Sequence, residues 1–595
     1  MIVLGINEDH NASVALVKDG RVIACAAEER FTRAKNDVGY PRQAIEFVLN
    51  WANIRPEDID SVVYAGFDQD PIQLKIKRVT RYKIKDYVRE MHDYWKPVLL
   101  EKRASIYWED VQKDSRLGAS DGNYYDFGFL ESIPKEQWLE AFREERKKVV
   151  FRHLGIPTDK VCFVDHHTAH AHYAYFAAPI DRSKRTAIVT ADGWGDGCNA
   201  TVSVAQGDTI TQVNRISNCH LARIYRWTTL VLGLKPNEHE YKVMGLAPYA
   251  KEYIKQPAYK IFKETLVVDG LDFRWNKQPS DTYFYFKEQF EIEGVRFDGI
   301  AGGLQDWLEE MVTEWIDNVL EELNADQLVF SGGLAMNVKA NKVISELARV
   351  KNFYVAGSGG DESLCIGAAY VVSNQSANKI QPVHHMYFGP ALSESEVEHA
   401  LKTSHAYERF EVIAQPTADD IADQLVQGKV IARCVGQMEF GARALGNRSI
   451  ICDPSNWENV RKINEMVKSR DFWMPFAPTI LSERADDYLV NPKGIMAPFM
   501  TIAFDTTPLA KKHLIASLHP YDFTARPQIL TQLANPDYYA IIKAFETRTG
   551  IGAVLNTSFN LHGEPIVCNA IDAMHTFVDS GLDGLLFPGV LLLKK

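Results

Sequence analysis

Two segments far apart in the chain, residues 2–20 and 188–208, carry the same pattern of strands and turns. In each, a short apolar strand and a polar turn lead into a similar run, NASVALVKDG from residue 11 and NATVSVAQGD from residue 199. The Asp-Gly and Gly-Asp pairs supply the positive φ that tight hairpins need. Each segment therefore predicts a strand, a loop, a second strand, a hairpin turn and a third strand, and their recurrence predicts a duplicated α/β domain.

Two further strands end in glycine-rich loops, at residues 328–337 and 354–361, where glycine lets the backbone approach a ligand closely. The composition then becomes linker-like over residues 373–379, and a new pattern starts after it. We place domains at 1–378 and 390–595. Residues 82–152, rich in Trp, Tyr, Lys and Glu at helical spacing, are expected to be an insertion that caps the first domain.

The bulk properties exclude several classes of protein. A chain of 595 residues is too long for one core and predicts two to four folding units. The net charge of -12 argues against a general nucleic-acid or membrane-surface binder, since such binders carry a basic excess. The 8 cysteines include no Cys-x-x-Cys pair, no apolar run reaches the length of a membrane span, and residues 1–7 lack a basic leader. We expect a cytoplasmic protein with reduced thiols.

Four histidines occur within residues 166–172, directly after a strand-like run. If a helix begins there, His166 and His170 lie one turn apart on the same face and can hold one metal ion. Asp192 and Asp361, each in a loop that follows a strand, complete a mixed nitrogen and oxygen site. The alternative is a helix start with incidental histidines, and a lone loop aspartate is commonly a cap or turn residue.

Arginines and lysines gather in the second half of an otherwise acidic chain. Arginine forks suit phosphate, so a polyanionic ligand such as ATP is expected at the basic residues Arg443, Arg448, Lys468, Arg470 and Arg526. Surface salt bridging is the alternative for any one of them. The chain has no Gly-x4-Gly-Lys-Ser/Thr motif, which excludes a P-loop. A buried strand near the C-terminus ends in the polar side chains of Asn556, Ser558 and Asn560, which suit ligand binding and turn formation equally well.

These segments together resemble the carbamoyltransferase family that includes nodulation-factor, cephem, novobiocin-type and tobramycin carbamoyltransferases. The resemblance covers nearly the whole chain. In the first domain it rests on the runs DHNAS at residue 9, AEERFTR at 27, the histidines at 166–170, KVMGLAPY at 242 and SGGLAMN at 331. In the second domain it rests on the segment 439–449, on PFAP at 475 and on the segment 556–560.

The resemblance implies an N-terminal domain of the duplicated actin-like ATPase (ASKHA) superfold and a YrdC-like α/β C-terminal domain. It implies that the C-terminal domain makes carbamoyl-AMP from ATP and carbamoyl phosphate, with Mg²⁺ expected beside the ATP, and that the N-terminal domain transfers the carbamoyl group to a hydroxyl. It also implies a divalent metal at His166, His170, Asp192 and Asp361, with iron expected first and manganese or zinc as alternatives. The implied catalytic residues are His10, Lys242 and Asp192. The implied ligand-binding residues add Gly332, Gly333 and Asn337 to the basic and polar residues named above.

Two positions depart from the family pattern. Met474 stands where many members have an arginine before the Pro-Phe-Ala-Pro segment, and Arg470 is the alternative supplier of that contact. Glu362 and Ser363 follow Asp361 where small residues are expected.

The acceptor stays open between an antibiotic sugar, a lipo-oligosaccharide sugar and another natural-product alcohol, as does the oligomeric state, with a homodimer as one option. We expect neither nucleic acid nor membrane as a partner. The competing hypotheses are a tRNA-modifying threonylcarbamoyl transferase and an actin-like nucleotide-binding scaffold without chemistry.

Overall fold

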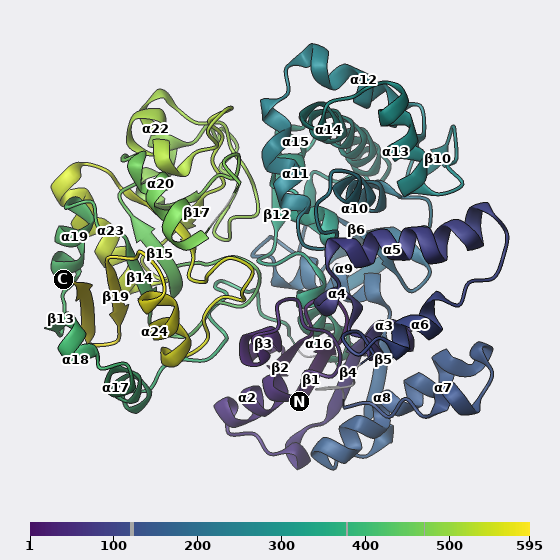
Figure 1. The fold of residues 1–595 in the computed structure, drawn as a ribbon, viewed down its shortest axis with the longest axis horizontal. Helices are drawn as coiled ribbons and strands as arrows, with labels where there is room; N and C mark the ends of the chain where they lie inside the picture. Colours follow the sequence, from purple (N-terminus) through teal and green to yellow (C-terminus); the bar gives the residue numbers. More distant parts are fainter. Residues whose placement is uncertain (119–123, 377–378, 469–470) are drawn as a thin grey trace. The chain divides into compact units, whose positions relative to one another are not determined.

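The computed structural model describes residues 1–118, 124–376, 379–468 and 471–595. The chain divides into two compact units (Figure 1). The first comprises residues 1–28 and 36–382, and the second comprises residues 383–595 together with the short segment 29–35. Arg470 lies outside the described residues. The fragment boundaries expected from the sequence, 1–378 and 390–595, stay a prediction.

The first unit contains two five-stranded sheets with the same topology. The first sheet has the strand order β3-β2-β1-β4-β5, and the second has the order β12-β11-β6-β7-β8. In each, three strands follow one another as antiparallel hairpins, and two more are added in parallel beside the first strand of the hairpins. The predicted duplication is confirmed, and the first unit is a duplicated α/β domain.

The strands of the first sheet are β1 (Ile2–Asn7), β2 (Ser13–Lys18), β3 (Arg21–Ala27), β4 (Ser61–Ala65) and β5 (Val161–Val164). Those of the second sheet are β6 (Thr186–Gly195), β7 (Cys198–Gln206), β8 (Thr209–Ile216), β11 (Gln327–Ser331) and β12 (Asn352–Val355). Most are Val- and Ile-rich runs buried on both faces. Asp19 and Gly20 take positive φ at the β2–β3 turn, and Gly207 takes positive φ at the β7–β8 turn, which is the equivalent turn of the second repeat.

Two helices pack between these sheets. Helix α9 (His166–Ala177) contacts β6 and β11, while α16 (Leu364–Gln375) contacts β1, β2 and β4, and the two helices contact each other. Glycine permits the close contacts. A Cβ on Gly367 would lie 2.0 Å from the carbonyl oxygen of Ala169, and a Cβ on Gly5 would lie 1.9 Å from that of Cys365. The backbones therefore touch where α16 meets α9 and β1.

Helical excursions leave the two repeats at different points, after the parallel strand β4 in the first repeat and after the last hairpin strand, β8, in the second. Between β4 and β5 the chain forms a helical segment that includes α3 (Pro71–Lys75), α5 (Ile84–Glu90) and α8 (Trp138–Leu154), and residues 82–152 lie inside it. Between β8 and β11 it forms α10 (Leu221–Val231), α11 (Glu240–Leu246), α12 (Glu252–Lys263), α13 (Thr282–Ile292) and α14 (Phe297–Glu322). The part of the first excursion from α3 to α6 (Tyr107–Lys113) and helix α10 share an aromatic core that contains Tyr82, Tyr87, Tyr107 and Trp227.

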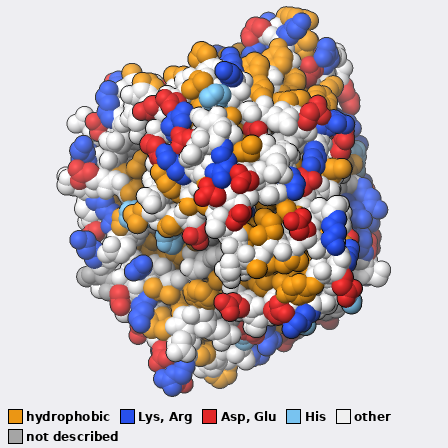
Figure 2. All heavy atoms as spheres, turned by 90° about the vertical axis from the view of Figure 1, so that its left-hand side faces the viewer, with side chains coloured by type: hydrophobic (Ala, Val, Ile, Leu, Met, Phe, Trp, Pro, Cys, Tyr) orange, Lys and Arg blue, Asp and Glu red, His pale blue; other side chains and the backbone are white. Residues whose placement is uncertain are grey.

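The second unit is a mixed α/β domain around one eight-stranded sheet. The strand order is β13 (Phe410–Ala414), β20 (Val590–Lys594), β19 (Gly584–Phe587), β14 (Ile431–Cys434), β15 (Arg448–Cys452), β18 (Ala553–Ser558), β16 (Ala477–Leu481) and β17 (Gln528–Leu530). Helices α17 (Glu394–Thr403) and α24 (Ala570–Val578) contact each other, and both contribute to the core of this unit together with Phe410, Ile450, Leu555 and Phe587. On the face in Figure 2, acidic and basic side chains are interspersed.

We predict that Gly367→Ala destabilises the first unit. The added methyl group meets backbone and not a movable side chain, so α9 and α16 must separate, and overpacking of this kind costs about 1–3 kcal/mol. Thermal unfolding followed by calorimetry should show a loss of several degrees. Gly193→Ala is the matched control, because a Cβ there meets nothing within 4 Å. Equal unfolding temperatures for the two variants would contradict the proposed contact.

Candidate functional site

The first unit gathers polar residues where four strands end. His166 follows β5, Asp192 lies near the end of β6, Ser331 ends β11, and Asp361 follows β12. Loops at the carboxyl ends of parallel strands commonly form the ligand site of an α/β sheet. The sequence-predicted metal residues therefore come from three separate strand ends and meet at one place.

Helix α9 begins where the sequence predicted a helix. Asp165 caps its N-terminus, since its carboxylate accepts the backbone N–H of Thr168 at 2.8 Å. His166 and His170 are then one turn apart, with ring centroids separated by 4.7 Å. His167 faces elsewhere, and its ring nitrogens lie 2.8 Å from Thr190 Oγ1 and 3.3 Å from the carbonyl oxygen of Cys198.

Two imidazoles and two carboxylates form a compact cluster. His170 Nε2 lies 3.5 Å from Asp192 Oδ2 and 3.4 Å from Asp361 Oδ1, and His166 Nε2 lies 3.8 Å from the same Asp361 oxygen. One ligand atom from each of the four residues lies within 4.8 Å of the others. The two histidines are buried and the two aspartates are nearly so.

The donor atoms of this cluster fit a metal ion. His166 Nε2, His170 Nε2 and Asp361 Oδ1 are buried and have no hydrogen-bond partner among the described residues. Buried polar atoms without partners are costly in a folded protein unless something binds them. Two nitrogens and two carboxylate oxygens suit iron, manganese or zinc better than magnesium, which prefers oxygen ligands.

The electrostatics of the two carboxylates agree with this interpretation. Burial and the nearby charge of Asp192 raise the pKa of Asp361 well above its usual value. Burial alone would also raise the pKa of Asp192, but the contact with His170 and the charges of both imidazoles outweigh it and hold that pKa below its usual value. Two buried carboxylates this close repel each other, and a divalent cation would remove that repulsion.

Ser331 orients one of the metal-facing histidines. Its hydroxyl oxygen lies 3.3 Å from His170 Nδ1 and donates to the carbonyl oxygen of Gly359 at 3.3 Å, so it accepts the Nδ1 proton. That tautomer leaves Nε2 of His170 with a lone pair directed at the cluster. The backbone N–H of Gly332 also donates to Gly359 at 2.8 Å, which fixes the loop that carries Asp361.

Asp196 orients the other histidine. Its carboxylate accepts the backbone N–H groups of Phe67 at 2.9 Å, of Asp68 at 2.9 Å and of His166 at 2.7 Å. It thereby joins the loop after β4, the start of α9 and the β6–β7 turn. Sequence analysis missed both Ser331 and Asp196, because each acts through partners that are distant in sequence; the only signal was that each lies in a motif already singled out.

The remaining sequence-predicted residues of the first unit lie in loops and helices of that unit. The backbone N–H of Gly333 donates to Asp192 Oδ2, and Asn337 caps α15 (Val338–Glu346) by accepting the N–H of Ala340 at 3.0 Å. His10 lies in the loop after β1, and its Nδ1 is buried without a hydrogen-bond partner in the described part of the chain. Lys242 is buried on α11.

In the second unit, a carboxylate shapes the loop that carries Arg443. Glu439 Oε1 accepts the backbone N–H groups of Leu445 at 2.6 Å, Asn447 at 3.2 Å and Arg448 at 3.2 Å. Arg448 itself is buried, and its guanidinium donates to backbone carbonyls that include Val435 at 2.8 Å. Arg448 therefore supports this loop, and ligand binding by Arg443 stays a prediction.

The other predicted residues of this unit form a second polar group. Lys468 Nζ donates to Ser558 O at 2.6 Å, to Asn560 Oδ1 at 2.7 Å and to Asn560 O at 3.0 Å, so these three residues lie together. Asn556 Nδ2 donates to the carbonyl of Ala444, while its Oδ1 is buried with no partner among the residues that the structure describes. Arg526 is half-buried in the same unit.

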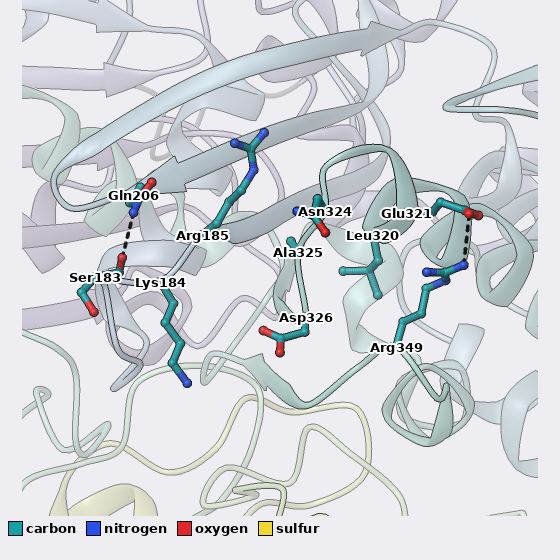
Figure 3. A pocket seen from close by; sticks show the side chains of 10 residues that line it. All are labelled: Ser183, Lys184, Arg185, Gln206, Leu320, Glu321, Asn324, Ala325, Asp326 and Arg349. Atoms are coloured by element: carbon teal, nitrogen blue, oxygen red, sulfur yellow. Dashed lines mark hydrogen bonds and ion pairs between the residues drawn. The ribbon is translucent and has the colours of Figure 1, made fainter.

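A surface hollow lies at the opposite edge of the second sheet (Figure 3). It is lined by residues that precede β6 and β11, among them Lys184, Arg185 and Asp326, and its charged side chains are exposed and of both signs. The amino ends of parallel strands are not where ligands of α/β sheets commonly bind. The residues of this hollow play no part in the metal-facing cluster.

Comparison with known proteins decides the family. Residues 2–370 match the carbamoyltransferase N-terminus, and residues 422–594 match the carbamoyltransferase C-terminus. The chain belongs to the carbamoyltransferase family. It is therefore a transferase.

Full-length relatives of this carbamoyltransferase occur in distant organisms. It is 32% identical over 610 residues to an uncharacterised protein of Methanocaldococcus jannaschii, with all of both chains covered. It is 30% identical over 601 residues to the nodulation protein NolNO of Sinorhizobium fredii, which covers 98% of this chain and 79% of the relative. Among solved structures, component A of the Acidaminococcus fermentans (R)-2-hydroxyglutaryl-CoA dehydratase aligns at 12% identity with a TM-score of 0.32, covering 63% of this chain and 99% of that one. A likeness at that level does not bear on function.

Within the described residues, the helices of this carbamoyltransferase are too short or too polar to cross a bilayer.

We predict that the carbamoyltransferase binds one divalent transition-metal ion per chain through the cluster. Replacing both His166 and His170 with Ala should lower the bound metal per chain by at least nine-tenths, because two of the four ligands are lost. Metal content after dialysis is the measurement. His172→Ala is the control, since its Nδ1 lies 2.9 Å from the carbonyl of Thr168 and it is not part of the cluster. A double variant that keeps its metal would show that the ion binds elsewhere.

Proposed function

We propose that this protein is an ATP-dependent O-carbamoyltransferase that uses carbamoyl phosphate and modifies a hydroxyl of a small-molecule or sugar acceptor. The observation that carries the proposal is the buried cluster of His166, His170, Asp192 and Asp361 in a member of the carbamoyltransferase family. Such acceptors occur in natural-product, antibiotic and glycoconjugate biosynthesis. The acidic net charge supports a small acceptor over a nucleic acid.

The second unit would form the activated carbamoyl group. Water releases phosphate from carbamoyl phosphate and leaves carbamate. A carbamate oxygen then attacks the α-phosphorus of ATP, the bond to the β-phosphate oxygen breaks, and carbamoyl-AMP and pyrophosphate result. Arg443, Lys468 and Arg526 would offset the charge of the phosphates, with Arg470 as a further candidate. Asn556 supplies a buried acceptor oxygen in the same unit.

The first unit would then transfer the carbamoyl group. The acceptor hydroxyl oxygen attacks the carbamoyl carbon, the bond from that carbon to the AMP oxygen breaks, and a carbamate ester and AMP result. The hydroxyl proton needs a base, and the buried Nδ1 of His10 supports that role. Lys242 would bind the AMP phosphate. Gly332 and Gly333, whose N–H groups donate to Gly359 and Asp192, would let the nucleotide approach the backbone closely. A divalent metal, with iron expected first, would polarise the carbamoyl oxygen or hold the adenylate phosphate.

The protein would act in the cytoplasm, where ATP and carbamoyl phosphate are available. This division of labour assigns adenylate formation to residues 390–595 and transfer to residues 1–378.

Incubation of the protein with ATP and carbamoyl phosphate, without an acceptor, tests the proposal directly. Carbamoyl-AMP and pyrophosphate should form together, and both should require carbamoyl phosphate. Binding of ATP without pyrophosphate would instead identify a nucleotide-binding scaffold. The double His166→Ala, His170→Ala variant should still release pyrophosphate, because both substitutions lie in the first unit and pyrophosphate is released by the second.

We predict that Arg443→Ala lowers carbamoyl-phosphate-dependent pyrophosphate release by on the order of hundredfold. Loss of a charge-assisted phosphate contact typically costs a few kcal/mol of transition-state stabilisation. The matched control is Arg461→Ala in the same unit, whose side chain is 67% exposed and pairs with Glu458 on the surface. A folded Arg443 variant with the rate of the control would show that ATP binds elsewhere.

A further inference from the structure

A short segment from early in the chain belongs to the second unit. Residues 29–35 lie between β3 and α2 (Arg42–Ala52) in the sequence, yet they group with residues 383–595 in the fold. They fall in the run AEERFTR at residue 27, which carries part of the family resemblance. The chemistry proposed for the two units gives this run no role, so its contacts in the second unit need an explanation.

Arg33 binds the backbone of the loop at residues 559–569, which joins β18 to α24. Its Nη1 donates to the carbonyl oxygen of Ile566 at 2.7 Å, and its Nη2 donates to that of Pro565 at 2.9 Å. Its Nε lies 3.6 Å from the carboxylate of Asp572. Arg33 also has a φ of 58°, a left-handed conformation that residues other than glycine rarely adopt. Such strain persists where surrounding contacts fix the residue, and the forked guanidinium provides those contacts here.

Arg30 holds the loop that carries Arg443, residues 435–447 between β14 and β15. Its Nη2 donates to the carbonyl oxygen of Gly441, two residues before Arg443, at 2.9 Å. The guanidinium is buried and lies 3.2 Å from the carboxylate of Glu29, which offsets its charge. The Glu439 carboxylate holds the later part of the same loop, so Arg30 fixes the part that precedes Arg443.

Phe31 joins these two loops. Its ring packs against a small cluster of buried side chains, Met438, Ile566 and Cys568. Met438 lies in the Arg443 loop, whereas Ile566 and Cys568 lie in the 559–569 loop. One aromatic side chain thus covers the place where the two loops meet.

The 559–569 loop in turn supports Lys468. Asn560 Nδ2 donates to the carbonyl oxygen of Glu564 at 2.8 Å, and Asn560 Oδ1 accepts Lys468 Nζ at 2.7 Å. The N–H of Val567 donates to the carbonyl oxygen of Phe559 at 3.0 Å, which closes the loop on the end of β18. Both loops that the segment contacts therefore position side chains that we propose to bind phosphate.

We propose that Arg30, Phe31 and Arg33 are positioning residues for the formation of carbamoyl-AMP, and that they hold the two loops in the arrangement that binds ATP. The adenylate-forming unit then requires residues 29–35, and residues 390–595 alone do not suffice. This inference rests on the proposed function of the second unit.

The physical reason is that neither loop has a helix or strand ladder to fix its backbone. Hydrogen bonds to its carbonyls and packing on its apolar side chains set where Arg443 and Lys468 point. A misplacement of about 1 Å can lower a rate by on the order of a hundredfold. A segment that merely stabilised the fold would act differently, because its loss would lower the folded fraction, and with it kcat, while the remaining folded molecules kept their KM.

Steady-state kinetics on the full chain test the inference. In Phe31→Ala and in Arg33→Ala, the KM for ATP in carbamoyl-phosphate-dependent pyrophosphate release should rise at least fivefold, while bound metal stays at the wild-type level. Phe31→Leu should restore most of the affinity, because leucine still fills the apolar cluster. Arg33→Lys should not, because an ammonium group lacks the fork. Phe297→Ala is the matched control, since Phe297 is 57% exposed on α14.

Hydrogen exchange read by mass spectrometry follows the loops themselves. Phe31→Ala should speed the exchange of backbone N–H groups in residues 435–447 and 559–569 at least tenfold, because the ring no longer holds the loops together. Exchange in β20, in the same unit, should stay unchanged.

Three results would overturn the inference: a lower kcat with an unchanged KM, faster exchange throughout residues 383–595, or variants that keep both the kinetics and the exchange of the wild type. The first two would make the segment a stabiliser of the fold only. If the wild-type chain releases no pyrophosphate, the proposed function fails. The exchange pattern and the affinity for a fluorescent ATP analogue then decide whether the segment positions these loops.

Discussion

The direct backbone contact between α9 and α16 is the constraint on which the N-terminal unit depends. Gly367 lets the two helices touch at Ala169, one residue before His170, and Gly5 lets α16 touch β1. Helix α9 belongs in sequence to the first repeat, yet it also packs on β6 and β11 of the second. This contact brings the end of β5 beside the ends of β6, β11 and β12. Without it, the two histidines would not meet Asp192 and Asp361.

Local chemistry explains why much of this fold could be predicted. Two adjacent residues determine a hairpin turn such as Asp19-Gly20. If a helix begins at His166, helical spacing places His170 beside it. To predict Asp192 and Asp361 as metal ligands, we also needed the family resemblance and the rule that the loops at the carboxyl ends of strands converge. The roles of Ser331 and Asp196 could not be predicted, because each depends on partners up to 161 positions away in the chain that only the folded sheet brings near.

Both units use one physical device to hold a functional loop. Asp196 and Glu439 each accept three backbone N–H groups with a single carboxylate, the first at the start of α9 and the second in the loop of Arg443. A carboxylate that accepts several N–H groups keeps its negative charge at low cost, and it fixes backbone that has no helix or strand ladder. In the N-terminal unit the clustered side chains are acids and imidazoles, which suit a cation. In the C-terminal unit the side chains that we propose to bind ligand are bases and amides, which suit phosphate.

Glu362, which departs from the family pattern after Asp361, also supports a loop through its carboxylate. Glu362 is buried, but its carboxylate accepts the hydroxyl of Ser358, and its backbone carbonyl accepts Ser13 Oγ from β2 at 2.6 Å. Ser358 has a φ of 61°, a conformation that a non-glycine residue adopts only with some support, and the Glu362 carboxylate provides it. A larger acidic residue therefore does not open the metal-facing site. It closes the glycine loop on itself and leaves Asp361, one position earlier, directed at His170.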